Sequence, residues 1–335
     1  MIKSFEITPG HHCFYASIWN LLRYYQINIS EQDIFFMMGF HIHLDACQNK
    51  ETQHKNMLCF DTFEVLFERI ASRLDCAPQM QIIESKEDFS KYVTDNVSLG
   101  VPVILCVDPY ILEYQTVQTN LSNLHYVLIT DYDCQKETVL LHDAYVLDIE
   151  GNVKTFSGVY DVSRLYSKTI NCMWFESPMH NITITNDTIL TDAKNLIRSF
   201  IYDSTKHNAI EGNRAIQIFM NCYQEKISQG NFFSVDQCIQ IILFVKAKLF
   251  PLFQYTAEFL RYNYYKEEEE GPAIILSLKE LENKWAEIIK LLLIVNYKQT
   301  DVLIQKLLIE ANYVIKKQQQ VYEMIYSFWN SLDKL

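Results

Sequence analysis

The chain contains little glycine and proline for its length. Of its 335 residues, 8 are glycine and 7 are proline, well below the average usage of about 7% and about 5%. Tight turns depend on these residue types, so an all-β protein is excluded. Hydrophobic residues make up 49% of the chain, which supports a full core and excludes disorder as the dominant state. Long regular elements, mostly helices, are expected.

Basic residues are also scarce. The 29 Lys and Arg residues face 41 Asp and Glu residues, which gives a net charge of −12. Nucleic-acid affinity depends on Lys and Arg contacts to phosphates, so no nucleic-acid partner is expected. No GxGxxG or GxxxxGK[ST] motif is present, so nothing predicts nucleotide binding. The same charge opposes an acidic protein partner unless a local basic patch exists, and the sequence does not locate one.

The sequence shows few signs of paired cysteines, and neither a signal peptide nor a membrane span is expected. The nine cysteines are odd in number and form no CxxC pair, which argues against a disulfide framework. The N-terminal segment MIKSFEITPGHHC has no apolar core. The most apolar stretch, 241–253, is short and contains Lys246 and Lys248. These features predict a cytoplasmic protein without a membrane segment.

The chain divides into two parts of different character. Residues 1–185 mix helix and strand patterns, whereas residues 186–335 have almost entirely helical patterns. The polar stretch 177–181 marks the boundary. The predicted class is α+β: a domain with an N-terminal helix packed on an antiparallel sheet, then an all-α helical domain. The helices expected in the second domain are 188–206, 211–229, 234–263, 273–298 and 300–331.

The first domain contains the clearest local signals. Apolar residues at helical spacing predict a helix from Cys13 to Tyr25, directly after the Pro9-Gly10 break. The continuous apolar run 101–107 predicts a buried strand. Two further strand-like runs, 125–130 and 138–143, are joined by a polar link and predict a hairpin.

Cys13 is the strongest candidate nucleophile. A thiol becomes nucleophilic as a thiolate, which a helix N-terminus and a neighbouring histidine favour. Cys13 opens the first predicted helix and therefore faces its unpaired N–H groups. The other cysteines have no such setting and are interpreted mostly as small buried apolar residues.

The hairpin supplies a candidate base and its partner. If the turn is centred on Cys134, His125 lies directly opposite Asp143, with both side chains on one face. A carboxylate in that place holds the imidazole tautomer and supports the imidazolium. His142 would face the other side. A one-residue bulge would replace Asp143 by His142 or Ala144.

Other polar residues have less defined roles. Asp108 and Tyr110, at the end of the 101–107 strand, either bind a cationic amine or cap the strand. His12, beside the nucleophile, is assigned to substrate binding. The run His41-x-His43-x-Asp45 is too sparse for a metal site, and no metal or cofactor is expected.

Several segments carry a resemblance to a known family. His12-Cys13, the run Ser17–Tyr25 and the segment Phe35–Phe40 resemble the opening of the butirosin biosynthesis protein H family. Residues 101–110 resemble its strand ending in an aspartate with nearby tyrosines. Residues 125–133 resemble its histidine strand, and Asp143 its acidic position.

The resemblance implies a papain-like cysteine-peptidase fold used for acyl transfer. In that family an acyl group passes from the phosphopantetheine thioester of a carrier protein to the enzyme cysteine and then to an amine. Papain-like peptidases usually place an oxyanion-binding glutamine six residues before the cysteine, whereas this chain has Ile7. Thr8, His11, His12 and Asn20 are alternative donors.

Three hypotheses follow. The leading one is an amide-forming acyltransferase with a Cys13–His125–Asp143 triad, whose partners are an acyl or peptidyl carrier protein and a small amine. The second is a cysteine peptidase, amidase or thioesterase. The third is a binding module without activity. The helical domain either shapes the acceptor pocket or forms a homodimer, and the sequence does not choose between these.

Overall fold

The fold is described from a computed structural model. It covers residues 5–45, 57–115, 124–148, 150, 152–176, 184–202, 210–228, 241–242, 244–265, 272–298 and 300–332. The chain forms two compact units, and the first comprises Met1–Met38 and Phe63–Thr185. The second comprises Gly39–Thr62 and Asn186–Leu335. One of these boundaries lies at 185/186, where the sequence analysis divides the chain. The sequence analysis did not expect the segment 39–62 to belong to the second unit. The polar stretch 177–181 lies outside the described residues.

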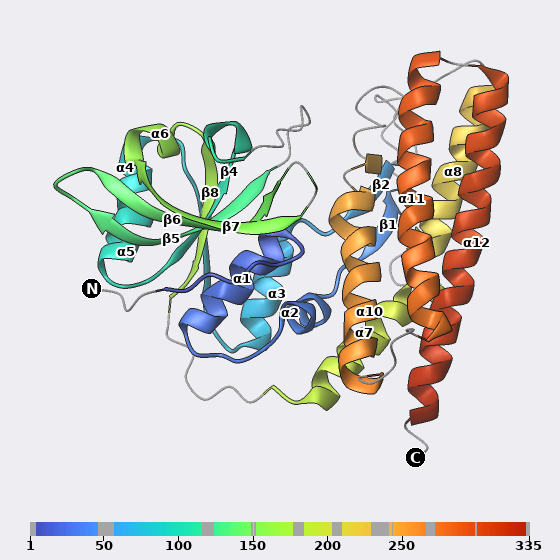
Figure 1. The fold of residues 1–335 in the computed structure, drawn as a ribbon, viewed down its shortest axis with the longest axis horizontal. Helices are drawn as coiled ribbons and strands as arrows, with labels where there is room; N and C mark the ends of the chain where they lie inside the picture. Colours follow the sequence, from blue (N-terminus) through green and yellow to red (C-terminus); the bar gives the residue numbers. More distant parts are fainter. Residues whose placement is uncertain are drawn as a thin grey trace. The chain divides into compact units, whose positions relative to one another are not determined.

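The first unit is built on a six-stranded antiparallel sheet (Figure 1). Its strand order is β3-β8-β4-β5-β6-β7, so the predicted α+β class is confirmed. The strands are β3 (Pro78–Ile82), β4 (Val103–Val107), β5 (His125–Asp133), β6 (Thr138–Leu147), β7 (Val153–Asp161) and β8 (Thr169–Phe175). The helices are α1 (Cys13–Tyr24), α2 (Glu31–Met38), α3 (Phe63–Arg73), α4 (Lys86–Phe89), η1 (Ser90–Thr94), α5 (Asp95–Ser98), η2 (Pro109–Ile111) and α6 (Val162–Tyr166).

Helices cover both faces of the sheet, which explains the continuous apolar run of β4. Alternate residues Val103, Leu105 and Val107 join the core with residues of α4, η1, α5 and α6. On the other face, Tyr126 of β5 contacts Phe14 of α1 and Phe63 of α3 through edge-to-face ring pairs. Every residue of β4 is buried. A strand buried on both faces loses polar alternation, and this confirms the prediction for this segment.

The second unit is mainly helical. Its helices are α7 (Asn186–Ile201), α8 (Gly212–Ser228), η4 (Val245–Leu249), α10 (Phe250–Tyr264), α11 (Ala273–Lys298) and α12 (Asp301–Leu332). A small sheet in the order β2-β1-β9 accompanies them, made of β1 (Ile42–Asp45), β2 (Met57–Phe60) and β9 (Ile210–Glu211). The secondary structure described beyond residue 185 is therefore helical as expected, apart from the two residues of β9. Among the helices described, none combines the length and apolar character that crossing a membrane requires.

The hairpin of β5 and β6 forms as predicted, but its register differs. The strands pair Asp133 with Thr138, so the turn is centred between residues 135 and 136 and not on Cys134. Asp133 causes this, because its Oδ1 accepts hydrogen bonds from the N–H groups of Gln135 and Lys136. Thr130 then forms a one-residue bulge between Ile129 and Asp131. The predicted direct pairing of His125 with Asp143 is therefore wrong.

The bulge also creates a buried polar contact on the other face of the hairpin. His142 is 3% exposed, and its ring nitrogens lie 2.8 Å from Thr130 Oγ1 and 2.8 Å from Ser157 Oγ. The Phe5 ring packs against the imidazole at 5.0 Å. Burial lowers the pKa of His142 from 6.5 to about 4. The imidazole is therefore neutral in the folded protein at neutral pH.

This histidine makes stability depend on pH. The unfolded chain binds a proton at His142 near pH 6.5 and the folded chain near pH 4, so acid favours unfolding. We expect the contribution of neutral His142 to the free energy of unfolding, about 3 kcal/mol, to be complete above pH 6.5 and to be lost as the pH falls towards 4. Urea unfolding of the wild type and His142→Gln measures it. The stability difference between the two proteins shrinks on acidification, and a constant difference would refute the assignment.

Candidate active site

Cys13 is the first residue of α1, as predicted. The helix begins there because His12 adopts an extended conformation and its Nδ1 accepts a hydrogen bond from Phe14 N–H at 3.2 Å. Cys13 is 9% exposed. Its backbone N–H lies in the first helical turn, where donors have no intrahelical acceptor. The sulfur and a backbone donor therefore stand together at the positive end of the helix.

The segment before Cys13 is fixed from two sides. The Glu31 carboxylate accepts hydrogen bonds from the backbone N–H groups of His11 and His12 at 2.9 to 3.2 Å. Gly10 N–H donates to Ala144 O at 3.0 Å. A Cβ on Gly10 would lie 2.4 Å from the Ala16 Cβ, so only glycine fits this close approach. Cys13 is thus held by rigid surroundings.

Asn20 strengthens the same segment. This fully buried side chain accepts a hydrogen bond from Thr8 N–H at 2.8 Å and donates to the carbonyl oxygens of Thr8 and Ala16. Both amide donors are therefore used within the fold. The expectation that Asn20 serves as an oxyanion donor is wrong, and the backbone N–H groups of Thr8, His11 and His12 are likewise hydrogen-bonded elsewhere.

His125 and Asp143 are in contact despite the shifted register. His125 Nε2 lies 2.7 Å from Asp143 Oδ2. On the N-terminal side of the bulge in β5, Leu128 pairs with His142. Continuing this register places Asp143 opposite Val127. The contact with His125 is therefore diagonal, over a separation that long side chains bridge. Without the extra residue at Thr130, Asp143 would stand opposite Leu128 and face away from His125.

Cys13 lies close enough to His125 to change its titration. Burial lowers the pKa of His125, but the Asp143 charge, the Cys13 charge and hydrogen bonds from both side chains raise it further, and the net pKa is above 6.5. Since Nε2 faces Asp143, Nδ1 is the ring nitrogen left for Cys13. The structure thus brings the three predicted residues together, while their catalytic roles stay a prediction.

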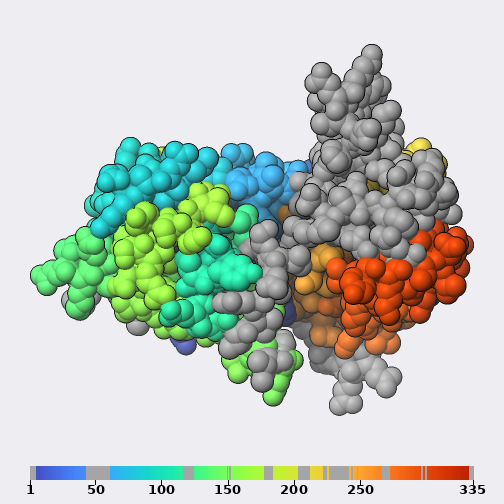
Figure 2. Space-filling model, turned by 90° about the horizontal axis from the view of Figure 1, so that it is seen from above, coloured from blue at the N-terminus to red at the C-terminus, as the bar shows by residue number. Residues whose placement is uncertain are grey.

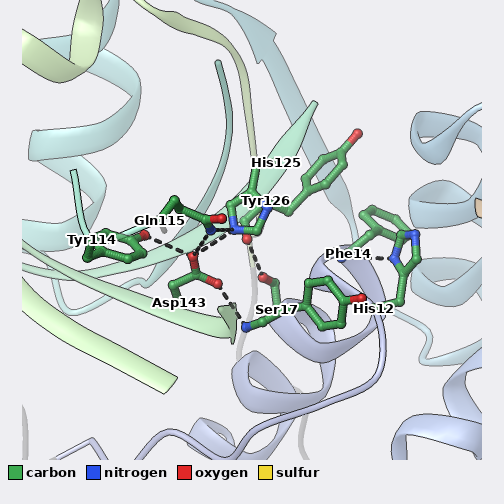
Figure 3. A network of polar contacts seen from close by, with 9 residues as sticks. His12, Phe14, Ser17, Tyr114, Gln115, His125, Tyr126 and Asp143 are labelled. Atoms are coloured by element: carbon green, nitrogen blue, oxygen red, sulfur yellow. Dashed lines mark hydrogen bonds and ion pairs between the residues drawn. The ribbon is translucent and has the colours of Figure 1, made fainter. Parts of the chain in front are cut away.

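The Asp143 carboxylate is fully buried and fully hydrogen-bonded (Figure 3). Besides His125, its Oδ2 accepts hydrogen bonds from Tyr114 Oη at 2.9 Å and Gln115 Nε2 at 3.0 Å. Its Oδ1 accepts one from Tyr145 N–H at 2.9 Å. Burial raises the pKa of Asp143, but the His125 charge and these donors outweigh burial and lower it. Asp143 is therefore ionised at neutral pH.

Sequence reasoning missed Tyr114 and Gln115. Tyr114 stacks on Phe156 with ring centroids 3.7 Å apart, and Gln115 Nε2 lies 3.1 Å from His125 Nε2 as well as close to Asp143. Both follow η2 in a loop without periodicity. The only sequence signal for these two residues is that an aromatic and a polar residue stand side by side shortly before the strand that begins at His125. This signal is weak.

The predicted substrate-binding residues have structural contacts. Asp108 Oδ1 accepts a hydrogen bond from Tyr110 N–H at 3.0 Å and caps η2. His12 caps α1, and Tyr110 is 47% exposed. Asp108 directly follows Val107, which pairs with His125, so this cap adjoins His125. Binding of substrate by these three residues stays a prediction.

The sequence favours no metal site at His41, His43 and Asp45. The backbone of His41 donates to Asp61 at 2.9 Å, and the side chains of His43 and Asp45 lie outside the described ones. Within the part of the chain that the structure describes, no group of three or more His, Cys, Asp or Glu residues could hold a metal ion.

Comparison with known proteins finds a family that the N-terminal part of the chain resembles. Residues 12–144 match the family described as Butirosin biosynthesis protein H, N-terminal. The predicted resemblance to this family is therefore confirmed over residues 12–144. The matched range begins at the helix cap of α1 and ends just after Asp143. No curated protein matches the chain.

The charge of Asp143 is expected to govern the protonation of His125. Asp143→Asn removes the largest contribution that raises the pKa of His125, so we expect that pKa to fall by at least about one unit. Tyr114→Phe keeps the charge and removes one hydrogen bond, so its effect should be smaller. NMR titration of ¹³C-labelled histidine measures both. An unchanged His125 titration in Asp143→Asn would contradict the proposed coupling.

Proposed function

We propose that this chain is a cysteine acyltransferase that forms amide bonds in the biosynthesis of a natural product. The acyl group would come from a thioester on a carrier protein and pass through Cys13 to an amine. The observation that carries the proposal is the placement of Cys13 at a helix start, electrostatically coupled to His125, which contacts a buried ionised carboxylate. The family name, which refers to butirosin biosynthesis, supports an antibiotic pathway.

A papain-like arrangement supports the assignment of roles. A nucleophile on a helix that packs against a sheet bearing the base, in the chain order Cys, His, Asp, is typical of that class. Here α1 packs on β5 through Phe14 and Tyr126 and through a hydrogen bond from Ser17 Oγ to Tyr126 O at 3.2 Å. Cys13 is the nucleophile, His125 the acid and base, and Asp143 the group that orients and stabilises the imidazolium.

The first half-reaction loads the enzyme. His125 takes the proton of the Cys13 thiol, and the sulfur attacks the carbonyl carbon of the donor thioester. The negative oxygen that forms is stabilised by the backbone N–H of Cys13 at the helix start. Collapse of this intermediate breaks the bond to the donor sulfur. His125 protonates the departing thiolate, and an acyl-Cys13 thioester remains.

The second half-reaction forms the amide. The nitrogen of the acceptor amine attacks the acyl-Cys13 carbonyl while His125 takes the amine proton. The carbon–sulfur bond to Cys13 then breaks, which releases the amide and restores the thiolate–imidazolium pair. Both steps act on a thioester, which is more activated than a peptide bond. An oxyanion site without the papain-type glutamine therefore suffices.

The two substrates are assigned by chemical class, as a carrier-borne acyl thioester and an amine. A carrier-borne acyl thioester needs no cofactor on this chain, because the phosphopantetheine belongs to the carrier. The exposed Tyr110 and the Asp108 carboxylate adjoin the base, and we assign them to the approach of a cationic amine. The proposal places the reaction in the cytoplasm, where carrier-bound acyl groups are made.

The test is transfer of an acyl group in the presence of an amine. Wild-type protein is incubated with aminoacyl and short-chain acyl N-acetylcysteamine thioesters and a panel of primary amines. We expect a covalent acyl adduct on Cys13 and an amide product by mass spectrometry. Cys13→Ala should abolish both, and His125→Ala should slow loading by about a hundredfold or more.

Cys134→Ala is the matched control, because this exposed cysteine lies in the β5–β6 turn. It should keep wild-type loading and transfer. Full amide formation by Cys13→Ala would refute the proposal. Free acid as the product with every amine would replace acyl transfer by hydrolysis, and absence of any adduct would favour the binding module.

A further inference from the structure

Gln115 contacts both members of the buried ion pair, yet the proposed reaction assigns it no role. Its Nε2 lies 3.0 Å from Asp143 Oδ2 and 3.1 Å from His125 Nε2, and those two atoms lie 2.7 Å apart. The three atoms form a closed triangle whose sides are no longer than single hydrogen bonds. Figure 3 shows this triangle, with the Gln115 amide above the carboxylate in that view. No water molecule fits between any two of its members.

The hydrogen-bonding need of Asp143 does not explain this geometry. Besides His125, Tyr114 Oη donates to Oδ2 and the Tyr145 N–H donates to Oδ1. Both oxygens of the buried carboxylate therefore have the donors that burial requires without Gln115. The contact between Gln115 and the imidazole is an additional feature, so its effect concerns the His125–Asp143 pair as a whole.

Gln115 extends from a surface loop that is anchored in the core. Its N–H donates to Leu112 O at 2.9 Å, and Leu112 is fully buried in the core of the first unit. The neighbouring Tyr114 stacks on Phe156 of β7. Figure 2 shows the teal and green segments of this unit, to which the loop belongs, at the molecular surface. The half-buried Gln115 side chain thus reaches from a fixed support to the buried pair.

The triangle restricts the orientation of the His125 ring. With Nε2 at Asp143, Nδ1 is the nitrogen that remains for the Cys13 proton. A half-turn of the ring about its bond to Cβ would put carbon atoms in both places and remove the proton acceptor. Gln115 bounds Nε2 from a second direction, so a tilt of the ring to that side would bring it against the amide. It also keeps water from this side of the shared carboxylate oxygen, and exclusion of water strengthens an ion pair.

We propose that Gln115 is a positioning residue that holds His125 in the orientation needed to accept the Cys13 proton. This inference rests on the proposed function, because only that reaction makes His125 a base. A fixed base matters, since a displacement of about 1 Å can slow a reaction about a hundredfold. Gln115 acts on the reaction through His125, and the reactivity of Cys13 tests this action without any acyl donor.

The test measures the reactivity of the Cys13 thiol, which a neighbouring imidazolium increases. Alkylation by iodoacetamide is followed by mass spectrometry of the Cys13 peptide between about pH 5 and about pH 9. Gln115→Leu removes the amide at similar size. We expect about tenfold slower alkylation near neutral pH. The midpoint of the pH profile should move to higher pH, because a thiolate without a well-placed imidazolium has a higher pKa. The melting temperature should not change.

Other titratable groups around the pair do not account for such a midpoint. Burial raises the pKa of Tyr114 far above its usual range and that of Tyr145 to about 12. Although burial raises the pKa of Asp143, the His125 charge and the donors outweigh it, and the net pKa is lowered. The two tyrosines therefore stay neutral and Asp143 stays ionised across the measured range. The midpoint reports the Cys13–His125 pair.

A double-mutant cycle separates positioning from a merely structural role. If Gln115 acts through the His125–Asp143 pair, its effect should disappear once that pair is broken. We expect Gln115→Leu to change the alkylation rate by less than about twofold in an Asp143→Asn background. An equal factor in both backgrounds would refute the proposal, because the two residues would then act independently.

Two more variants guard against misfolding and nonspecific effects. Gln115→Asn keeps an amide at this position but is too short to complete the triangle, so it should share the slower alkylation even if Gln115→Leu fails to fold. Gln135→Leu is the matched control, because this glutamine is exposed in the β5–β6 turn. It should keep the wild-type rate and pH profile.

The two proposals can fail separately. Wild-type alkylation in both Gln115→Leu and Gln115→Asn would overturn the positioning role and leave the acyltransferase standing. Where thioesters load Cys13, Gln115→Leu should lower kcat for loading about tenfold with an unchanged KM, and a change in KM alone would assign Gln115 to substrate binding instead. If no thioester loads the wild type, the acyltransferase fails, while the alkylation cycle still decides the role of Gln115.

Discussion

The buried carboxylate of Asp143 is the constraint around which the N-terminal unit is organised. A fully buried charge is costly unless every lone pair is used and an opposite charge is near. Here the donors come from Tyr114, Gln115, the Tyr145 backbone and His125. The loop after η2 and the strands β5 and β6 must therefore all be folded for the buried Asp143 charge to be stable. The ion pair is then an indicator of correct folding as much as a part of the site.

The same constraint explains which parts of the site could be predicted. The start of α1 follows from local chemistry, because Pro9, Gly10 and the cap at His12 act within a few residues. The sequence analysis predicted that His125 and Asp143 share one face of the hairpin, but it did so from a wrong register. The prediction held because the turn shifted the pairing by three residues and the Thr130 bulge shifted it back by one, so the net shift of two residues preserved strand parity. A bulge depends on packing and has no clear signal in one sequence.

The contributions from distant parts of the chain could not be predicted. Tyr114 reaches Asp143 only because it stacks on Phe156 of β7, and Glu31 reaches the segment before Cys13 from the next helix. The segment 39–62 belongs to the second unit although it lies within the first in sequence. Its strand β1 pairs with β9, more than 160 residues later. Such pairings are set by tertiary packing, which local periodicity does not encode.

The electrostatics of the site link the pKa of His125 to the state of Cys13 in the proposed reaction. Four favourable influences raise the pKa of His125, and the charge and hydrogen bond of Cys13 are two of them. When Cys13 becomes an acyl thioester, its charge and hydrogen bond disappear, while burial continues to favour the neutral imidazole. Acylation would thus lower the pKa of His125 and turn an imidazolium into a base when an amine must be deprotonated. In the proposed reaction, release of the product would restore the thiolate and with it the imidazolium. Asp143 would stay ionised throughout and limit the fall in the pKa of His125, so that the imidazole could still hold the proton taken from the amine.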